Sequence, residues 1–362
     1  MRRSLSAIAL LSGALLLACG GAEPPPPAAP PPPPPAPVAS APAPTESAAP
    51  APAPEPTPEE QKKAKALAAL KKDRDEWHAG HLAELARWTP AVHAAAGALA
   101  SKTYPTLQAA MKEILAGPQR KPGDADRDKF RHPLETLTFF GTRPNMTVLE
   151  VGPGEGWYTE ILAPMLASKG KLLGTSGDPN GPEDSRATFY AQRWQAFLAK
   201  APEVFGKVQT VVVDGKAPSL ASVPAGSVDQ VLLMREVHGM VNSGTLPTWL
   251  GEIRKVLKPG GVLGIEEHRA KPDADPVESS KKGYVPEPWL IDQVKAAGFK
   301  LDGKSEINAN PKDTKDYAEG VWALPPTLER GAQDREKLVA IGESDRMTLK
   351  FVKAPEAPAR KK

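Results

Sequence analysis

The sequence predicts an α/β protein whose central sheet is mostly parallel and is covered by helices on both faces. From about residue 121 onward, short and nearly continuous apolar runs alternate with stretches of helical periodicity. Strands that are apolar on both sides are typical of parallel sheets buried between two layers of helices. In addition, one apolar run leads directly into a glycine-rich turn, and α/β proteins bind ligands at such turns.

The predicted elements follow one another in the order that such a sheet requires. Buried strands are expected at Met146–Val151, Lys171–Thr175, Val208–Val213, Gln230–Met234 and Val262–Glu266. Helices between or after them are expected at Tyr158–Ala167, Asp184–Lys200, Leu246–Leu257 and Pro288–Ala297. A last apolar run, Met347–Val352, is placed to return as an antiparallel edge strand.

Residues 59–118 form an accessory helical region, because Ala, Leu, Lys and Glu recur there with helical spacing. Pro90 and Pro105 divide this region into about three helices, since proline is poorly tolerated inside a helix. His78 and His81 share a helix face, but no third ligand lies nearby in sequence, so we expect no metal site. The α/β domain is expected at residues 119–354, and a disordered tail is expected at residues 355–362.

The first residues have the pattern of an export signal. Arg2 and Arg3 precede an apolar stretch, Ala7–Leu17, that is too short to cross a bilayer, which takes about 20 helical residues. Leu16–Cys19 resembles the lipobox of bacterial lipoproteins, in which a small residue precedes a cysteine that becomes acylated. Cys19 is the only cysteine in the chain. We therefore expect a lipoprotein signal peptide at residues 1–18 and a membrane anchor on Cys19.

Residues 19–58 are expected to be a disordered stalk. Of the 42 prolines, 18 lie between Pro24 and Pro58, in a stretch made largely of proline and alanine. Such a segment favours an extended polyproline-II spacer and cannot build a core. Because Gly20 stands where the resemblance links an aspartate to inner-membrane retention, the protein is expected in the bacterial cell envelope, on the outer membrane facing the periplasm.

The charge of the chain gives no indication of nucleic-acid binding. The formal net charge is +3, and Lys and Arg form no cluster in the predicted domain. Proteins that bind nucleic acids usually carry a basic patch or stripe. The expected partners are therefore a small-molecule or envelope substrate and, through Cys19, a membrane.

The glycine-rich turn has an unusual spacing. Glu150-x-Gly152-x-Gly154-x-Gly156 follows the predicted strand Met146–Val151 and precedes a predicted helix. Dinucleotide-binding proteins instead use Gly-x-Gly-x-x-Gly, with a pyrophosphate at the helix N-terminus. An acid facing the ligand repels a pyrophosphate but suits a ligand that carries ammonium and sulfonium cations. The turn therefore disfavours a nicotinamide cofactor and favours S-adenosyl-L-methionine.

Other segments resemble the class I methyltransferases, which have a Rossmann-like fold with a seven-stranded sheet. Lys258–Leu263 is similar to their turn before the fifth strand. By resemblance, Tyr158 lies beside the cofactor turn and Asp214 binds the adenine amine. Asp178 either holds the ribose hydroxyls or belongs to an Asp-Pro-Asn turn. Further segments resemble exported bacterial proteins described as predicted methyltransferases: Arg131–Phe140, Gly156–Pro164, Ile307–Pro311 and Ile341–Met347.

The candidate catalytic residues follow the fourth and fifth predicted strands. His238 lies just after Gln230–Met234, whereas Glu267 and His268 end the run that begins at Val262. Methyl transfer needs a positioned nucleophile and in some cases a base, and histidine titrates near neutral pH. For His238 and His268, a catalytic and a structural role are both open. Arg131 and His132 either contact the ligand or pack against the domain.

Two functions remain open. The chain is either an S-adenosylmethionine-dependent methyltransferase or a non-catalytic, membrane-tethered lipoprotein that uses the same fold to bind a ligand or partner. The intact turn from Glu150 to Gly156 favours retained ligand binding. Export favours the second function, because S-adenosylmethionine is made in the cytoplasm.

Overall fold

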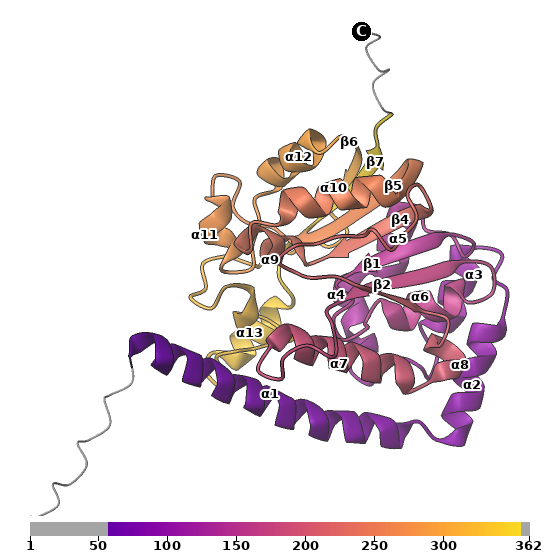
Figure 1. The fold of residues 1–362 in the computed structure, drawn as a ribbon, viewed down its shortest axis with the longest axis horizontal. Coiled ribbons are helices and arrows are strands. Elements are labelled where there is room, and N and C mark those ends of the chain that lie inside the picture. Colours follow the sequence, from indigo (N-terminus) through magenta and orange to yellow (C-terminus); the bar gives the residue numbers. More distant parts are fainter. Residues whose placement is uncertain (1–56, 356–362) are drawn as a thin grey trace, which may run out of the picture. The chain divides into compact units, whose positions relative to one another are not determined.

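A seven-stranded sheet runs through the molecule in the order β3-β2-β1-β4-β5-β7-β6 (Figure 1). The computed structural model describes residues 57–355. The strands are β1 (Thr147–Val151), β2 (Lys171–Ser176), β3 (Gln209–Val212), β4 (Val228–Met234), β5 (Leu257–His268), β6 (Phe299–Ser305) and β7 (Arg346–Lys353). From β3 to β5 all neighbours are parallel, so the predicted mostly parallel sheet is confirmed.

Two details of the sheet differ from the sequence prediction. Strand β7 is antiparallel, as expected, but it lies between β5 and β6 and is not the edge. Its residues Met347, Leu349 and Phe351 are fully buried. The edge is β6, which the sequence analysis missed because polar residues alternate along it and its exposed positions break the apolar pattern.

Helices cover both faces of the sheet. One layer, with its own apolar cluster, comprises α9 (Val237–Asn242), α10 (Leu246–Val256) and α12 (Glu287–Ala296). The other comprises α5 (Pro133–Phe140), α6 (Thr159–Leu166), α7 (Arg186–Ala199) and α8 (Pro202–Phe205). Short helices lie outside these layers at α4 (Asp128–Arg131), α11 (Pro276–Ser280) and α13 (Arg335–Ile341). Parallel strands and two helical layers place all carboxyl ends of β1 to β5 at one edge, where ligands bind.

The N-terminal helical extension has three helices, α1 (Pro58–Arg87), α2 (Pro90–Ser101) and α3 (Leu107–Ile114). Helix α1 begins at a capping box, in which Thr57 accepts the Glu60 amide and the Glu60 carboxylate accepts the Thr57 amide. Helices α2 and α3 pack against α6 and α8 and contribute Ala96, Ala110 and Ile114 to the same apolar cluster. The extension is therefore part of the folded unit that contains the sheet.

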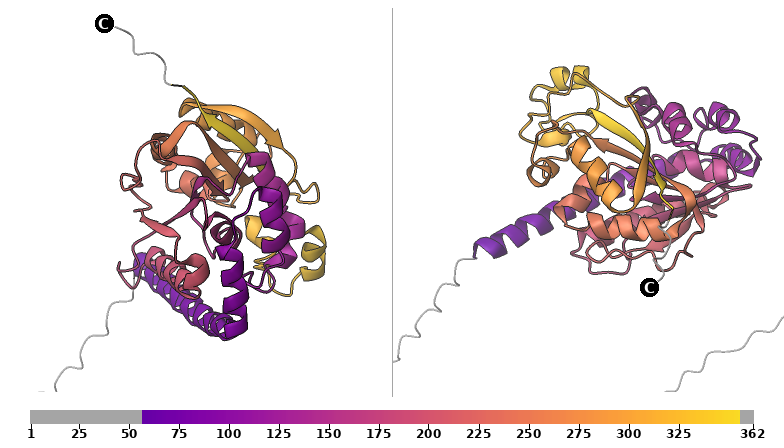
Figure 2. Two further views of the ribbon diagram at one scale, coloured as in Figure 1. Left: turned by 90° about the vertical axis from the view of Figure 1, so that its right-hand side faces the viewer. Right: turned by 90° about the horizontal axis from the view of Figure 1, so that it is seen from above.

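Helix α1 lies along α7, on the outside of the second layer (Figures 1 and 2). The predicted signal peptide, Cys19 and most of the proline-rich segment lie outside the described residues, as does the end of the C-terminal tail. Within residues 57–355, no helix combines the length and the apolar character needed to cross a membrane.

Candidate active site

A cavity of about 500 Å³ opens at the carboxyl ends of β1 to β4. The glycine-rich turn after β1 forms its floor, and α7 forms one wall. The residues that line it are Gly152, Pro153, Gly154, Glu155, Thr175, Ser176, Gly177, Ala187, Tyr190, Ala191, Arg193, Trp194, Val213, Gly215, Glu236 and Trp249. Its wall at α7 and β3 is largely aromatic and aliphatic, whereas Glu236 brings a carboxylate to the end beside β4.

The glycines of the turn have different physical roles. Gly154 has a φ of +58° and open space where a side chain would begin, so its backbone is accessible from the cavity. A Cβ on Gly156, where φ is +85°, would lie 2.4 Å from the Phe197 ring. A Cβ on Gly152 would lie 2.5 Å from the carboxyl carbon of Glu236. The Gly152 amide donates to Thr175 Oγ1 at 2.9 Å and ties the turn to β2.

The acid of the turn motif does not line this cavity. Glu150 is buried, and its carboxylate accepts a hydrogen bond from the Thr159 hydroxyl at 2.7 Å. Burial raises the pKa of Glu150 to about 7. The acid that does line the cavity is Glu236, which follows β4 and which sequence analysis did not single out. The carboxylate that faces the cavity therefore comes from Glu236 after β4, and not from Glu150 on β1 as expected.

The other residues predicted to bind the cofactor lie at or near the same sheet edge. Asp178 Oδ1 accepts the amide of Asn180 at 2.9 Å, so the Asp-Pro-Asn turn is formed. Asp214 Oδ1 accepts the amide of Lys216 at 2.9 Å, and the neighbours of Asp214, not Asp214 itself, line the cavity. The contacts of Asp178 and Asp214 with a ligand stay predictions.

Tyr158 lies in the protein interior beneath the turn. Its hydroxyl lies 3.4 Å from Glu266 Oε2, and its ring packs edge-on against Trp157. Burial, with the charge of Glu266, raises the pKa of Tyr158. Arg131 is also buried, since it pairs with Glu343 at 3.2 Å and covers the Trp157 ring. The position of Arg131 agrees with its packing interpretation.

His238 and Glu267 are brought together, as the ends of adjacent parallel strands should be. His238 Nδ1 lies 3.1 Å from Glu267 Oε1. The other oxygen of Glu267 accepts the Val237 amide at 2.6 Å and the His238 amide at 3.3 Å. Because a carboxylate only accepts, Nδ1 carries the hydrogen and neutral His238 has an unprotonated Nε2. Among residues 57–355, Nε2 has no hydrogen-bond partner, so it is available as a base.

The two histidines have opposite electrostatic settings. Burial lowers the pKa of His238, but the charge and hydrogen bond of Glu267 and the charge of Glu236 outweigh burial and raise this pKa. The pKa of His268 is lowered well below its usual value by burial and by the charges of His238 and Arg235. His268 Nδ1 lies 2.5 Å from Ser344 Oγ, and its ring centroid lies 5.8 Å from that of His238. His268 is therefore neutral at pH 7, and its catalytic or structural role stays a prediction.

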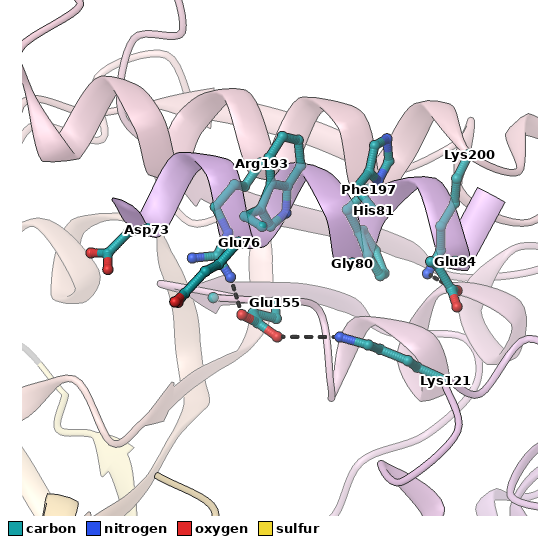
Figure 3. Close-up of a pocket in the computed structure, with 12 residues that line it drawn as sticks. Asp73, Glu76, Gly80, His81, Glu84, Lys121, Glu155, Arg193, Phe197 and Lys200 are labelled. Carbon is teal, nitrogen blue, oxygen red and sulfur yellow. Dashed lines mark hydrogen bonds and ion pairs between the residues drawn. The ribbon is translucent and has the colours of Figure 1, made fainter. Parts of the chain in front are cut away.

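A second cavity, of about 390 Å³, lies between α1, the glycine-rich turn and α7 (Figure 3). Gly154, Glu155 and Arg193 line both cavities. Figure 3 shows the Glu155 carboxylate between Arg193 and Lys121, with Lys121 Nζ at 3.6 Å. The ion pair between Glu155 and Arg193 therefore borders both cavities.

Side chains of helix α1 contact α7, the helix that forms one wall of the first cavity. Asp73 pairs with Arg186 at 2.6 Å, and Arg74 donates to Gln192 at 3.1 Å. Trp77 packs edge-on against Phe189, with ring centroids 5.9 Å apart. His81 stacks on Trp77, and no group of three or more potential metal ligands occurs in residues 57–355. The braced segment of α7 therefore includes the wall of the first cavity.

Comparison with known proteins finds a family that is similar to the α/β domain. Residues 125–301 match the family model described as a methyltransferase domain. No curated protein sequence matches the chain. The order of the strands and the helices on both faces of the sheet are those of the Rossmann-like class I methyltransferase fold. S-Adenosylmethionine is the cofactor of this class of domain.

Several solved structures are similar to the chain. A SAM-dependent methyltransferase from Aquifex aeolicus is 18% identical over 65% of this chain and 94% of its own, with a TM-score of 0.42. The [4+2]-cyclase SpnF is 17% identical over 70% of this chain and 98% of its own, with a TM-score of 0.43. The glycopeptide N-methyltransferase MtfA, complexed with S-adenosylhomocysteine, is 14% identical over 62% and 90%, with a TM-score of 0.39.

The residues of the first cavity fit S-adenosylmethionine. Its volume of about 500 Å³ lies in the range of small-molecule sites. The apolar wall with Tyr190 and Trp194 suits an adenosine, the open backbone of Gly154 allows close approach, and Glu236 suits a cation. When bound, S-adenosylmethionine supplies an electrophilic methyl group.

Proposed function

We propose that this chain transfers a methyl group from S-adenosylmethionine to a nucleophile of a small molecule or cell-envelope component, with His238 as the base. The observation that carries this proposal is the pairing of His238 Nδ1 with Glu267 at 3.1 Å, two residues after Glu236, which lines the cofactor cavity. An N–H, O–H or S–H acceptor loses a proton when it is methylated. Nε2 of His238 receives that proton, and Glu267 stabilises the resulting charged ring.

The surroundings of the pair support this assignment. Glu267 is fully buried and also accepts the His268 amide at 2.8 Å, so its orientation is fixed by four donors. Trp322 lies beside His238, with ring centroids 6.1 Å apart, and Tyr284 lies beside His268 at 6.4 Å. Aromatic side chains around a positioned base can exclude water and hold an organic acceptor.

We further propose that Cys19 is acylated and that the protein faces the periplasm from the outer membrane. The support is the charged and apolar pattern that precedes Cys19 in the sequence. Fractionation of cells that express the full chain or Cys19→Ser tests this localisation. The full chain should stay with the outer membrane and the variant should become soluble; recovery of both in the same fraction would overturn the proposal.

The methyl-transfer proposal is tested with full-length protein and S-adenosylmethionine labelled with tritium on its methyl group. Envelope extracts and small-molecule extracts are offered separately as acceptors, with His238→Asn as the matched variant. We expect label transfer by the wild type and a loss of about 100-fold or more in the variant. Equal transfer by both proteins would exclude His238 as the base.

The second candidate is a tethered, non-catalytic binding protein, and the export pattern of residues 1–18 favours it. A fold alone does not establish catalysis. This function predicts that the wild type binds S-adenosylmethionine by calorimetry but transfers no label to any extract. Transfer that depends on His238 would exclude it.

A further inference from the structure

Glu236 differs from the other acids around the cofactor cavity because its carboxylate has no partner. Within residues 57–355, no hydrogen bond or ion pair to this carboxylate is found, and only burial and nearby charges affect its pKa. By contrast, Glu155 pairs with Arg193, and Glu266 pairs with Arg235 at 2.8 Å. Glu267 is held by His238 and three backbone amides. A partly buried carboxylate without a donor is costly unless a ligand supplies the missing charge.

The backbone aims Glu236 at the place where the turn lacks a side chain. Its carboxyl carbon and Oε2 would lie 2.5 and 2.6 Å from a Cβ on Gly152. The preceding residue, Arg235, has a φ of +61°, a conformation that non-glycine residues rarely adopt. The chain therefore bends sharply after β4 and brings residue 236 to the cavity.

The charged groups around Glu236 leave it poised to ionise. Burial raises the pKa of Glu236 to about 8. The charges of Glu267 on β5 and Glu150 on β1 also raise it, whereas His238 on α9 and Arg235 at the end of β4 lower it. Without ligand, the Glu236 carboxyl is thus mostly neutral at pH 7, and a bound cation would favour its charged form.

The position of Glu236 also indicates which part of the ligand it meets. The cavity extends across the ends of β3, β2, β1 and β4. Its β3 end, with Val213 and the aromatic rings of α7, suits the adenine ring. The opposite end, at β4, carries the unpaired acid and suits the charged sulfur.

We propose that the carboxylate of Glu236 is the counter-ion of the sulfonium centre of S-adenosylmethionine and makes the site prefer this cofactor over S-adenosylhomocysteine. The inference rests on the cofactor assignment of the proposed function. S-Adenosylhomocysteine has the same adenosine and amino-acid parts but a neutral sulfur. Loss of the sulfonium charge leaves Glu236 without a counter-ion, so its carboxylate takes up a proton and the spent cofactor binds less tightly.

The test is titration calorimetry of the full chain with each ligand between pH 6 and pH 8.5. For the wild type, S-adenosylmethionine affinity should weaken by roughly tenfold per pH unit below pH 8, since the ionised carboxylate becomes scarce. In Glu236→Gln, S-adenosylmethionine binding at pH 8.5 should weaken about 10-fold to 100-fold and lose this pH dependence. S-Adenosylhomocysteine binding should stay within about threefold of the wild type.

Glu155→Gln is the matched control, because it removes another carboxylate from the same cavity but one that already has partners. It should change the affinities for both ligands by the same factor. Equal weakening of both ligands in Glu236→Gln, or an unchanged ratio at every pH, would overturn the counter-ion role alone. If the wild type binds neither ligand, the cofactor assignment fails and the counter-ion role fails with it.

Discussion

The Nδ1 atom of His238, on the helix α9 that follows β4, lies 3.1 Å from Oε1 of Glu267 at the end of the neighbouring parallel strand β5. This pair orients the ring and raises the pKa of His238 against the effect of burial, which lowers it. A base acts only when it is deprotonated, so kcat/KM should rise with pH through this elevated pKa.

Glu267→Gln should therefore move the acidic limb of the pH–rate profile to lower pH. The glutamine removes the negative charge that raises the pKa of His238. At the same time, the maximal rate should fall about 100-fold because the ring loses its orientation. Nuclear magnetic resonance titration of the His238 ring measures the same pKa without turnover. A limb that stays at the wild-type pH would contradict the role of Glu267.

Alanine substitutions at Gly154 and Gly156 should have different effects on ligand binding and on the free energy of unfolding. Gly154→Ala places a methyl group in open space beside the cavity, so it should weaken S-adenosylmethionine binding while the left-handed backbone costs only about 1 kcal/mol. Gly156→Ala adds an overlap with the Phe197 ring and should cost about 1 to 3 kcal/mol more. Denaturant unfolding and calorimetry measure the two effects. The reverse order of stabilities would contradict the packing described here.

Glu343 should be essential to a buried ion cluster near the site. It accepts from Arg127 at 2.7 Å, Arg131 at 3.2 Å and Arg346 at 2.8 Å. Burial by itself raises the pKa of Glu343, but these three guanidinium groups lower it to about 2. Glu343→Gln leaves buried arginines without their counter-ion and should cost about 3 to 5 kcal/mol of unfolding free energy at pH 7.

The cost of Glu343→Gln should depend on pH. Because the folded pKa lies below the unfolded one, the stabilisation by Glu343 is fully present above about pH 4.5 and is lost as pH falls toward 2. Urea unfolding of both proteins at pH 7, 4 and 3 should show the difference narrowing. A difference that is constant across this range would indicate that charge is not its source.

Trp77→Ala should weaken cofactor binding without touching the cofactor cavity. The ring of Trp77 packs edge-on against Phe189 of α7, and such pairs contribute about 0.5 to 1.5 kcal/mol. Its loss should loosen the wall of the cavity, weaken S-adenosylmethionine binding a few-fold and make α1 more sensitive to limited proteolysis. Leu67→Ala, on the same helix but 50% exposed, is the control and should behave as the wild type.

Much of the fold was predictable because its signals are local. The run Met146–Val151 and the glycines after it specify a strand, a turn and a helix within about 20 residues. The order of β6 and β7 in the sheet could not be predicted. Strand β7 inserts between β5 and β6, and this placement depends on contacts between residues that are distant in sequence. Alternating polar residues also made β6 resemble a loop.

The site was predictable to the extent that strand ends converge. His238 follows β4, Glu267 lies near the end of the adjacent strand β5, and their side chains meet at this edge of the sheet. The sequence did not show which of the acids near the strand ends has its carboxylate in the cavity. Glu150 carries the familiar spacing but turns toward Thr159, whereas the left-handed backbone of Arg235, which nothing in the sequence indicates, brings Glu236 to the cavity.

The first part of α1 extends the molecule as a stiff rod. From Pro58 to residue 69 every side chain is exposed, and Leu70 is the first that is buried. At 1.5 Å per residue, this stretch places the start of the helix about 18 Å from the point where its packing begins. Removing one residue from this stretch rotates the start of the helix by about 100° around the helix axis relative to Leu70. The length of α1 thus sets the direction in which residue 58 faces relative to the sheet.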